Sequence, residues 1–142
     1  MIRIVRLGTP RAKDEGLRLG TVRRPPRGVR KNDYARLDYY DLWLPDLAPS
    51  QALVSWAMSR PWSDARWAQF GRRYRAEMRA PAAQRLIALL AALSRQTDFS
   101  VGCYCEDAAR CHRSLLGALL EDAGARLDSA GARVKVEVRS EK

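Results

Sequence analysis

The chain has three cysteines, one histidine and no long apolar run. These absences argue against a membrane-spanning protein and against a disulfide-rich one. No apolar segment approaches the roughly 20 residues of a membrane-spanning helix, so we expect no membrane partner. The opening segment MIRIVRLGTP is interrupted by arginines and does not resemble a signal peptide, so we expect a cytoplasmic protein. In that compartment, three cysteines are better interpreted as thiols than as a disulfide framework.

Acidic residues are scarce relative to basic ones. The chain has 26 Lys and Arg against 16 Asp and Glu, which gives a formal net charge of +10. Such an excess favours an anionic partner, either an anionic small molecule or nucleic acid. Most of the basic residues are arginines, which suit bidentate contacts with phosphate and carboxylate. A solvated arginine-rich surface explains the same composition, and both interpretations stay open.

The apolar pattern alternates between strand and helix periods. Strands are predicted over residues 2–7, 17–22, 39–44, 98–105 and 133–139. Helices are predicted over residues 50–58, 63–78, 81–96 and 111–124. Ser50 and Ser63 are the expected N-caps of the first two helices. The expected apolar face of the 63–78 helix is Trp67, Phe70, Tyr74 and Met78, and that of the 81–96 helix is Leu86, Leu89, Leu90 and Leu93.

Strands near both ends and a mostly helical middle predict an α/β protein. We expect a single-domain layered fold with a small, mainly parallel sheet flanked by helices, and a C-terminal edge strand. The α/β domain should span residues 1–127, and residues 128–142 should form the edge strand and tail of the same domain.

Every cysteine and the only histidine lie within GCYCEDAARCHRSLLGALL, residues 102–120. The pattern predicts a strand, a turn and a helix start. Ligands collect outside the carboxyl ends of strands in open α/β sheets, and a helix N-terminus offers free N–H groups to an anion. Arg113 in the first helical turn would add a charge-assisted donor. We predict an anion site between Cys105 and Arg113, unless Cys111, His112 and Arg113 have purely structural roles.

Zinc is a further hypothesis for this segment. The residues with suitable ligand atoms are Cys103, Cys105, Cys111 and His112. Adjacent Cys111 and His112 at a helix start would point about 100° apart, and paired C-x2-C knuckles are absent. We therefore expect no metal and no other cofactor.

A thiol-dependent enzyme is the main alternative to a binding protein. Cys105 or Cys111, near a helix N-terminus and flanking arginines, would have a lowered pKa and could act as a nucleophile with His112 as acid or base. Asp41 is a further candidate for a general base or an anchor. The spacing from Cys105 to Arg110 is C-x4-R, one residue short of the C-x5-R phosphate loop of thiol phosphatases.

The segment RRPPRGVRK, residues 23–31, is a basic loop stiffened by two prolines. If it lies beside the turn at 105–113, the two segments make a basic pocket, with Trp43 or a nearby tyrosine available to stack on a ring. The candidate ligand-binding residues are Arg23, Arg27, Gly28, Asp41, Trp43 and Arg113. A solvated basic loop is the alternative interpretation.

Four segments, PPRGVRK, DLWLPDLAPS, RWAQFGRRYRAEM and CYCEDAARCHRSLLGALL, occur in an order that resembles the bacterial family called domain of unknown function 488, above all its YeaO-like branch. The resemblance spans about residues 2–127 and implies a small α/β protein without an assigned reaction. The family-like positions are Arg23, Pro26, Arg27, Gly28, Asp41, Trp43, Pro49, Ser50, Tyr74, Glu77, Cys103, Cys111, His112 and Arg113. Val22 stands where the family often has an acidic residue, and Pro25 where it often has Trp.

Overall fold

The computed structural model describes residues 1–105, 107 and 110–128, and its centre is a four-stranded parallel sheet. The strands are β1 (Ile2–Arg6), β2 (Leu17–Gly20), β3 (Leu42–Trp43) and β4 (Phe99–Cys103), in the order β1-β4-β2-β3. Each neighbouring pair is parallel. The predicted α/β layered fold with a small parallel sheet is therefore confirmed. The predicted edge strand at 133–139 lies outside the described residues.

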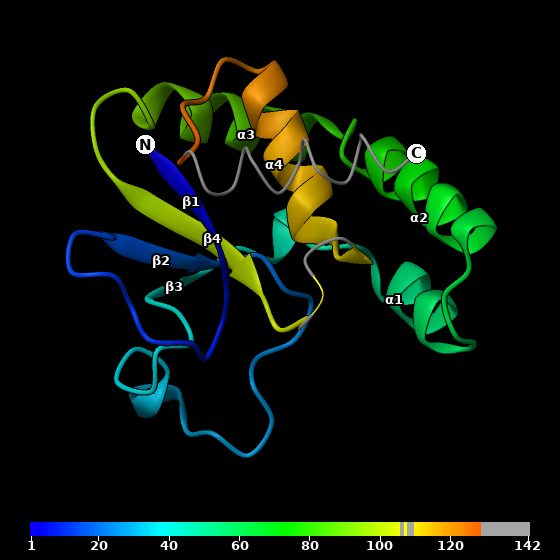
Figure 1. Cartoon of the computed structure of the whole chain (residues 1–142), viewed down its shortest axis with the longest axis horizontal. Helices are drawn as coiled ribbons and strands as arrows, with labels where there is room; N and C mark the ends of the chain where they lie inside the picture. The colour runs from blue at the N-terminus through cyan, green and yellow to red at the C-terminus, as the bar shows by residue number, and fades with distance from the viewer. Residues whose placement is uncertain (106, 108–109, 129–142) are drawn as a thin grey trace.

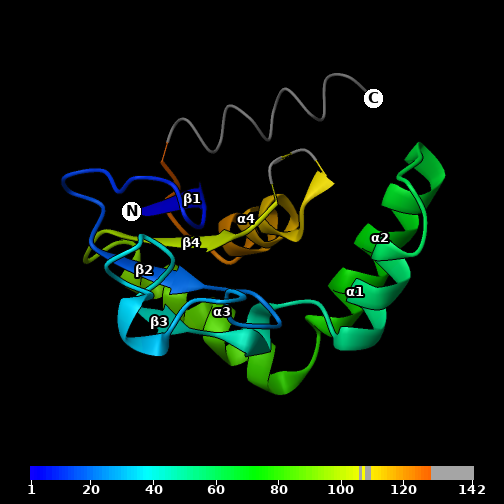
Figure 2. The same ribbon diagram turned by 90° about the horizontal axis from the view of Figure 1, so that it is seen from below.

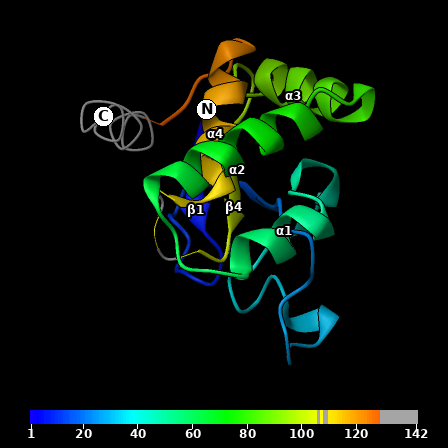
Figure 3. The same ribbon diagram turned by 90° about the vertical axis from the view of Figure 1, so that its right-hand side faces the viewer.

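Four α-helices accompany the sheet. They are α1 (Gln51–Met58), α2 (Asp64–Glu77), α3 (Pro81–Leu93) and α4 (His112–Asp122). Helices α3 and α4 lie together on one side of the sheet, and the long connections after β1 and β2 lie on the other side (Figure 1). Helices α1 and α2 stand beyond the ends of β2 and β4 (Figure 2), and they lie in front of the sheet when it is viewed from that end (Figure 3).

The helix starts follow from local capping chemistry. Ser50 is the N-cap of α1 and its side chain accepts a hydrogen bond from the Leu53 N–H. Ser63 does the same for the Arg66 N–H at the start of α2. Each bond satisfies one backbone N–H that the first helical turn leaves without a partner. Both predicted N-caps are confirmed.

The helices bury one apolar face each against the sheet and against one another. All four aromatic and Met positions expected on the face of α2 are buried: Trp67, Phe70, Tyr74 and Met78. The face expected for α3 is correct for Leu86 and Leu90, which pack in the core, and wrong for Leu89 and Leu93, which are 53% and 39% exposed. The buried positions of α3 are Ala83, Ile87, Leu90 and Ala91. Two of these positions are alanines, whose small side chains allow close packing. A prediction based on leucine spacing does not identify such a face.

The opposite face of the sheet carries a buried ion pair. The guanidinium of Arg18 in β2 donates to both carboxylate oxygens of Glu15, at 2.7 and 2.9 Å, and both residues are buried. Ser100 in β4 donates to the same carboxylate at 2.7 Å. The remaining guanidinium nitrogen of Arg18 donates to the backbone carbonyls of Thr9 and Asp38. This pair therefore ties the connections on that side to the middle of the sheet.

Glu15→Gln should strongly destabilise the protein. The variant leaves the buried Arg18 without its counter-charge, and we expect the free energy of unfolding to fall by about 3 kcal/mol or more. Urea unfolding at neutral pH measures the loss. The control is Asp14→Asn, which removes a carboxylate that is 76% exposed and pairs with Arg3; its cost should stay below about 1 kcal/mol. Equal losses in the two variants would contradict the role of the pair.

The same carboxylate should give the stability a pH dependence. Burial raises the pKa of Glu15, but hydrogen bonds from Arg18, Ser100 and the Ala12 N–H outweigh it and lower the pKa from 4.5 to about 2. A lowered pKa means that the stabilisation is complete above 4.5 and is lost as the pH falls toward 2. The difference in unfolding free energy between the native chain and Glu15→Gln should therefore shrink over that range. A difference independent of pH would refute this account.

Candidate functional site

The carboxyl ends of β1, β2 and β4 meet at one edge of the sheet because the strands are parallel. The backbones of β1 and β4 pack very closely there, since a Cβ on Gly102 would lie 2.6 Å from the Val5 carbonyl oxygen. The chain leaves β4 at Cys103 and returns at Cys111, the N-cap of α4. This edge therefore receives the start of a helix, as the sequence predicts.

A pocket of about 1010 Å³ opens at this edge. Its arginines come from the basic loop and from the turn before α4: Arg23, Arg24, Arg27 and Arg110. Its apolar wall comes from α1, α2 and the connection between them: Val54, Ala57, Met58, Trp62 and Phe70. All three cysteines and His112 also line it. The structure thus brings the 23–27 loop and the 103–112 segment around one cavity.

A direct hydrogen bond joins the two segments, and further bonds fix the 23–27 loop to α1 and to the residues before it. The Tyr104 hydroxyl donates to the backbone carbonyl of Arg24 at 2.9 Å. The Arg24 side chain donates to Gln51 at the start of α1. Arg23 donates to the carbonyls of Pro45, Ala48 and Pro49 at distances from 2.9 to 3.3 Å. Arg23 therefore lines the pocket, but its N–H groups are already hydrogen-bonded to backbone carbonyls.

Cys103 and Cys111 are joined as a disulfide, and both are buried. This pairing differs from the expected free thiols for two of the three cysteines. The pairing arises because β4 ends at Cys103 and α4 begins beside it, a proximity that the eight-residue separation in sequence does not reveal. Cys105 is the free cysteine among the described residues.

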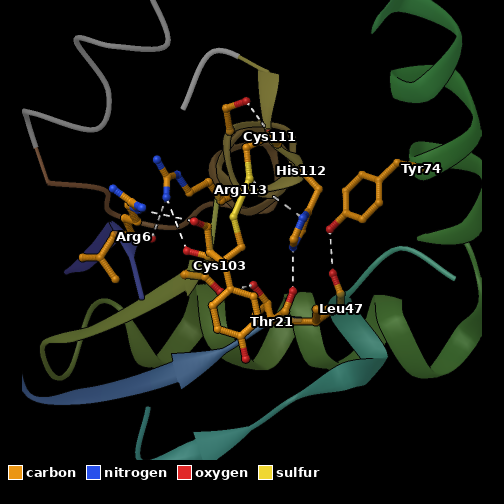
Figure 4. Close-up of a disulfide and its surroundings, with 12 residues drawn as sticks. Arg6, Thr21, Leu47, Tyr74, Cys103, Cys111, His112 and Arg113 are labelled. Atoms are coloured by element: carbon orange, nitrogen blue, oxygen red, sulfur yellow. Dashed lines mark hydrogen bonds between the residues drawn. A yellow bond between two sulfur atoms is a disulfide. The ribbon is translucent and has the colours of Figure 1, made fainter. Parts of the chain in front are cut away.

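His112 has a defined tautomer. Its Nε2 lies 2.6 Å from the Thr21 carbonyl oxygen, which can only accept a hydrogen bond, so Nε2 carries a proton. Burial lowers the pKa of His112 to about 4, so the ring is neutral and Nδ1 holds a lone pair. Nδ1 faces the Cys111 sulfur at 4.0 Å (Figure 4). The neutral ring offers an acceptor on its Nδ1 side.

The donor atoms of Cys103, Cys111 and His112 all lie within 4.8 Å of one another. The expected angle of about 100° between Cys111 and His112 does not keep their ligand atoms apart. Cys111 is an N-cap with extended backbone, φ −139° and ψ 144°, so the angular spacing of a helix does not apply between the two residues. Among the residues that the structure describes, these three could hold a metal ion.

The exposed Cys105 does not have the environment of an activated nucleophile. Desolvation raises the pKa of its thiol, and the charge of Arg113, which lowers it, does not offset this. The expected lowering of the Cys105 pKa is therefore wrong in direction. The helix start that was expected to activate this thiol begins seven positions later, at His112.

Asp41, Trp43 and Arg113 do not line the pocket. Asp41 accepts hydrogen bonds from Arg11 and from the Arg18 backbone N–H, so it organises the loops on the far face. The Trp43 indole donates to the Val22 carbonyl at 2.7 Å. Arg113 points to the opposite side of the disulfide from His112 (Figure 4).

Gly28 allows the basic loop to adopt a left-handed backbone conformation. Its φ is +71°, a left-handed conformation that glycine adopts without strain. A Cβ at this position would meet no heavy atom within 4 Å. Gly28 is also absent from the pocket lining, so it shapes the loop that carries Arg27.

The apolar wall of the pocket is the part of the site that sequence reasoning missed. Neither Trp62 nor any residue of the predicted 50–58 helix was among the candidate ligand-binding residues. A signal was present in α1, where Leu53, Val54, Trp56, Ala57 and Met58 make an eight-residue helix apolar on several sides. Only Leu53 of α1 is buried, and Met58 is 81% exposed. A short helix with more apolar surface than the core uses indicates a second apolar contact.

Comparison with known proteins identifies the family of this chain. A family model described as "Active DUF488-N3 subclade" matches residues 2–124, which is most of the chain. No curated protein and no solved structure matches. Among the described residues no helix is long and apolar enough to cross a membrane. The family match does not confirm the YeaO-like branch, but it shows that the chain belongs to the DUF488 family.

Proposed function

We propose that the protein binds a small molecule with an anionic group and an apolar, ring-bearing body in the pocket at the carboxyl edge of the sheet. The observation that carries the proposal is the two-sided lining, with arginines on one side and the apolar face of α1 on the other. The volume of about 1010 Å³ is in the range of small-molecule sites. A concave pocket favours a small ligand over a long nucleic acid.

Arg27 is the arginine best placed to meet an incoming anion. It is exposed at the pocket rim, and it has no hydrogen-bond or ion-pair partner in the described part of the chain. Arg110, by contrast, is bound to Asp64 at 2.6 Å, and Arg23 is bound to backbone carbonyls. A guanidinium free of protein partners can offer all its donors to a carboxylate, phosphate or sulfonate.

The apolar wall supplies the binding energy for the body of the ligand. Trp62 and Phe70 lie 5.5 Å apart between ring centroids in an edge-to-face arrangement. Trp62 is only half-buried, so part of its ring stays available to a ligand. Burying apolar ligand area stabilises a complex by roughly 25 cal/mol per Å². An aromatic or aliphatic ligand body therefore suits this side of the pocket.

A thiol-dependent enzyme is supported less well by these contacts. Cys111 is bonded to Cys103, which removes its nucleophilic thiol in this state. His112 holds the Thr21 carbonyl through Nε2, and the pKa of Cys105 is raised. We therefore place the anionic-ligand proposal first.

Arg27→Ala should weaken binding of an anionic aromatic probe. The probe is 8-anilinonaphthalene-1-sulfonate, and its neutral counterpart N-phenyl-1-naphthylamine has the same rings without the sulfonate. We expect Arg27→Ala to lower the affinity for the sulfonate about threefold to tenfold, because one charge-assisted contact is lost. The neutral probe should bind both proteins equally. Fluorescence titration measures both affinities.

Two controls make this test specific. Arg85→Ala removes the same charge from the exposed surface of α3 and should leave both affinities unchanged. Ala57→Trp fills the apolar wall and should abolish binding of both probes, whereas Ala52→Trp, on the exposed first turn of α1, should not. Equal effects of Arg27→Ala and Arg85→Ala, or of the two tryptophan variants, would overturn the proposal.

A further inference from the structure

The base of the pocket contains three metal-ligand atoms that the proposed function does not use. They are the sulfurs of Cys103 and Cys111 and a ring nitrogen of His112, all within 4.8 Å of one another, and the Cys111 sulfur lies 4.0 Å from Nδ1. The three residues are at least nine-tenths buried, and all three line the pocket. They come from the end of β4 and the start of α4, so the fold brings the set together.

The imidazole is oriented as a metal ligand is. Its Nε2–H donates to the Thr21 carbonyl at 2.6 Å, which leaves the Nδ1 lone pair directed at the Cys111 side (Figure 4). Histidines that bind metals almost always donate their other ring N–H to a carbonyl or carboxylate, which fixes the ring and raises its basicity. Thr21 is itself held to β4, since its N–H and its hydroxyl both donate to the Gly102 carbonyl.

The backbone spacing suits a bridging ion. The Cα atoms of Cys103 and Cys111 lie 7.9 Å apart. Disulfides usually join Cα atoms about 4.4–6.8 Å apart. Zinc–sulfur bonds of about 2.3 Å in a tetrahedral site separate two sulfurs by roughly 3.8 Å, which a wider Cα spacing accommodates. The positions of β4 and α4 thus leave room for a metal ion between the two side chains.

We propose that, when the Cys103–Cys111 disulfide is reduced, the two cysteines and His112 Nδ1 bind one Zn²⁺ ion whose fourth position faces the pocket. Reduction adds two electrons and two protons to the disulfide, supplied by a dithiol that becomes a cyclic disulfide. Zn²⁺ then displaces the two thiol protons. Three protein ligands with an open fourth position are the pattern of catalytic and ligand-binding zinc sites.

Charge and ligand chemistry both select this kind of ion. Two buried thiolates alone would place two negative charges in a desolvated site, and a divalent cation cancels them. Thiolate and imidazole ligands suit zinc, whereas magnesium and calcium require oxygen ligands. Disulfide and metal site use the same two sulfurs, so the oxidised protein cannot hold the ion. The proposal does not rest on the anionic-ligand proposal.

Cobalt substitution tests the site directly. The full chain is reduced with a phosphine, freed of oxygen and titrated with Co²⁺, which gives intense visible and near-ultraviolet absorption when bound tetrahedrally by thiolates. We expect roughly one Co²⁺ per chain, displaced by Zn²⁺, and no such absorption from the oxidised protein. Cys111→Ser should weaken Co²⁺ binding about 100-fold or more and weaken the thiolate band. Cys105→Ser, the matched control, should change neither.

Three results would overturn the proposal. They are a reduced native chain without the thiolate–cobalt band, a band of equal intensity in the oxidised chain, and loss of the band in Cys105→Ser. The first two use only the native protein, so they decide the matter even where Cys111→Ser fails to fold. Arg27→Ala should leave the cobalt spectrum unchanged, which separates failure here from failure of the ligand proposal.

Discussion

The hydrogen bond from His112 Nε2 to the Thr21 carbonyl is the contact on which the site depends. Thr21 follows β2 and donates twice to Gly102 in β4. His112 is the first residue of α4, so this one bond holds the helix start against the carboxyl ends of two neighbouring strands. The ring of Tyr74 in α2 lies 5.6 Å from that of His112, and its hydroxyl donates to the Leu47 carbonyl. His112 therefore positions both α4, which it begins, and α2, whose Tyr74 packs against its ring.

The pocket has two chemically different parts, a base with sulfur and imidazole ligand atoms and a rim with arginines. The imidazole is held so that a ring nitrogen and the sulfurs of Cys103 and Cys111 gather at the base. Three of the four pocket arginines lie on the 23–27 loop, which the Tyr104 hydroxyl holds through the Arg24 carbonyl. A zinc ion at the base and an arginine at the rim would both attract an anion. The two proposals use different residues, but they describe one cavity with compatible chemistry.

Sequence periodicity predicted the four strands and four α-helices of the described residues and both serine caps, because those depend on local hydrogen bonding and on apolar spacing. It failed in part for the face of α3, where the small residues Ala83 and Ala91 pack inward while Leu89 stays exposed. The sequence suggested a basic pocket only on the condition that the 23–31 loop lies beside the 105–113 turn, and residues of both segments do line one pocket.

The details of the site were harder to predict, for physical reasons. The partners of Asp41 and Arg113 are carbonyls and ions distant in sequence, so no pattern indicated that these side chains turn away from the pocket. The angle between Cys111 and His112 was taken from an ideal helix, but an N-cap residue has extended backbone. The apolar wall depends on how α1 and α2 stand beyond the sheet, which is a tertiary arrangement.

The most direct test of the proposed role of His112 is to measure which of its two ring nitrogens carries the proton. The chain has one histidine, so ¹⁵N labelling of its ring gives two nitrogen signals that need no assignment to a residue. At neutral pH we expect a protonated Nε2 and an unprotonated Nδ1, with Nδ1 as the nitrogen whose signal moves when Zn²⁺ is added to the reduced protein. A proton on Nδ1, or a zinc-induced change confined to Nε2, would contradict that role.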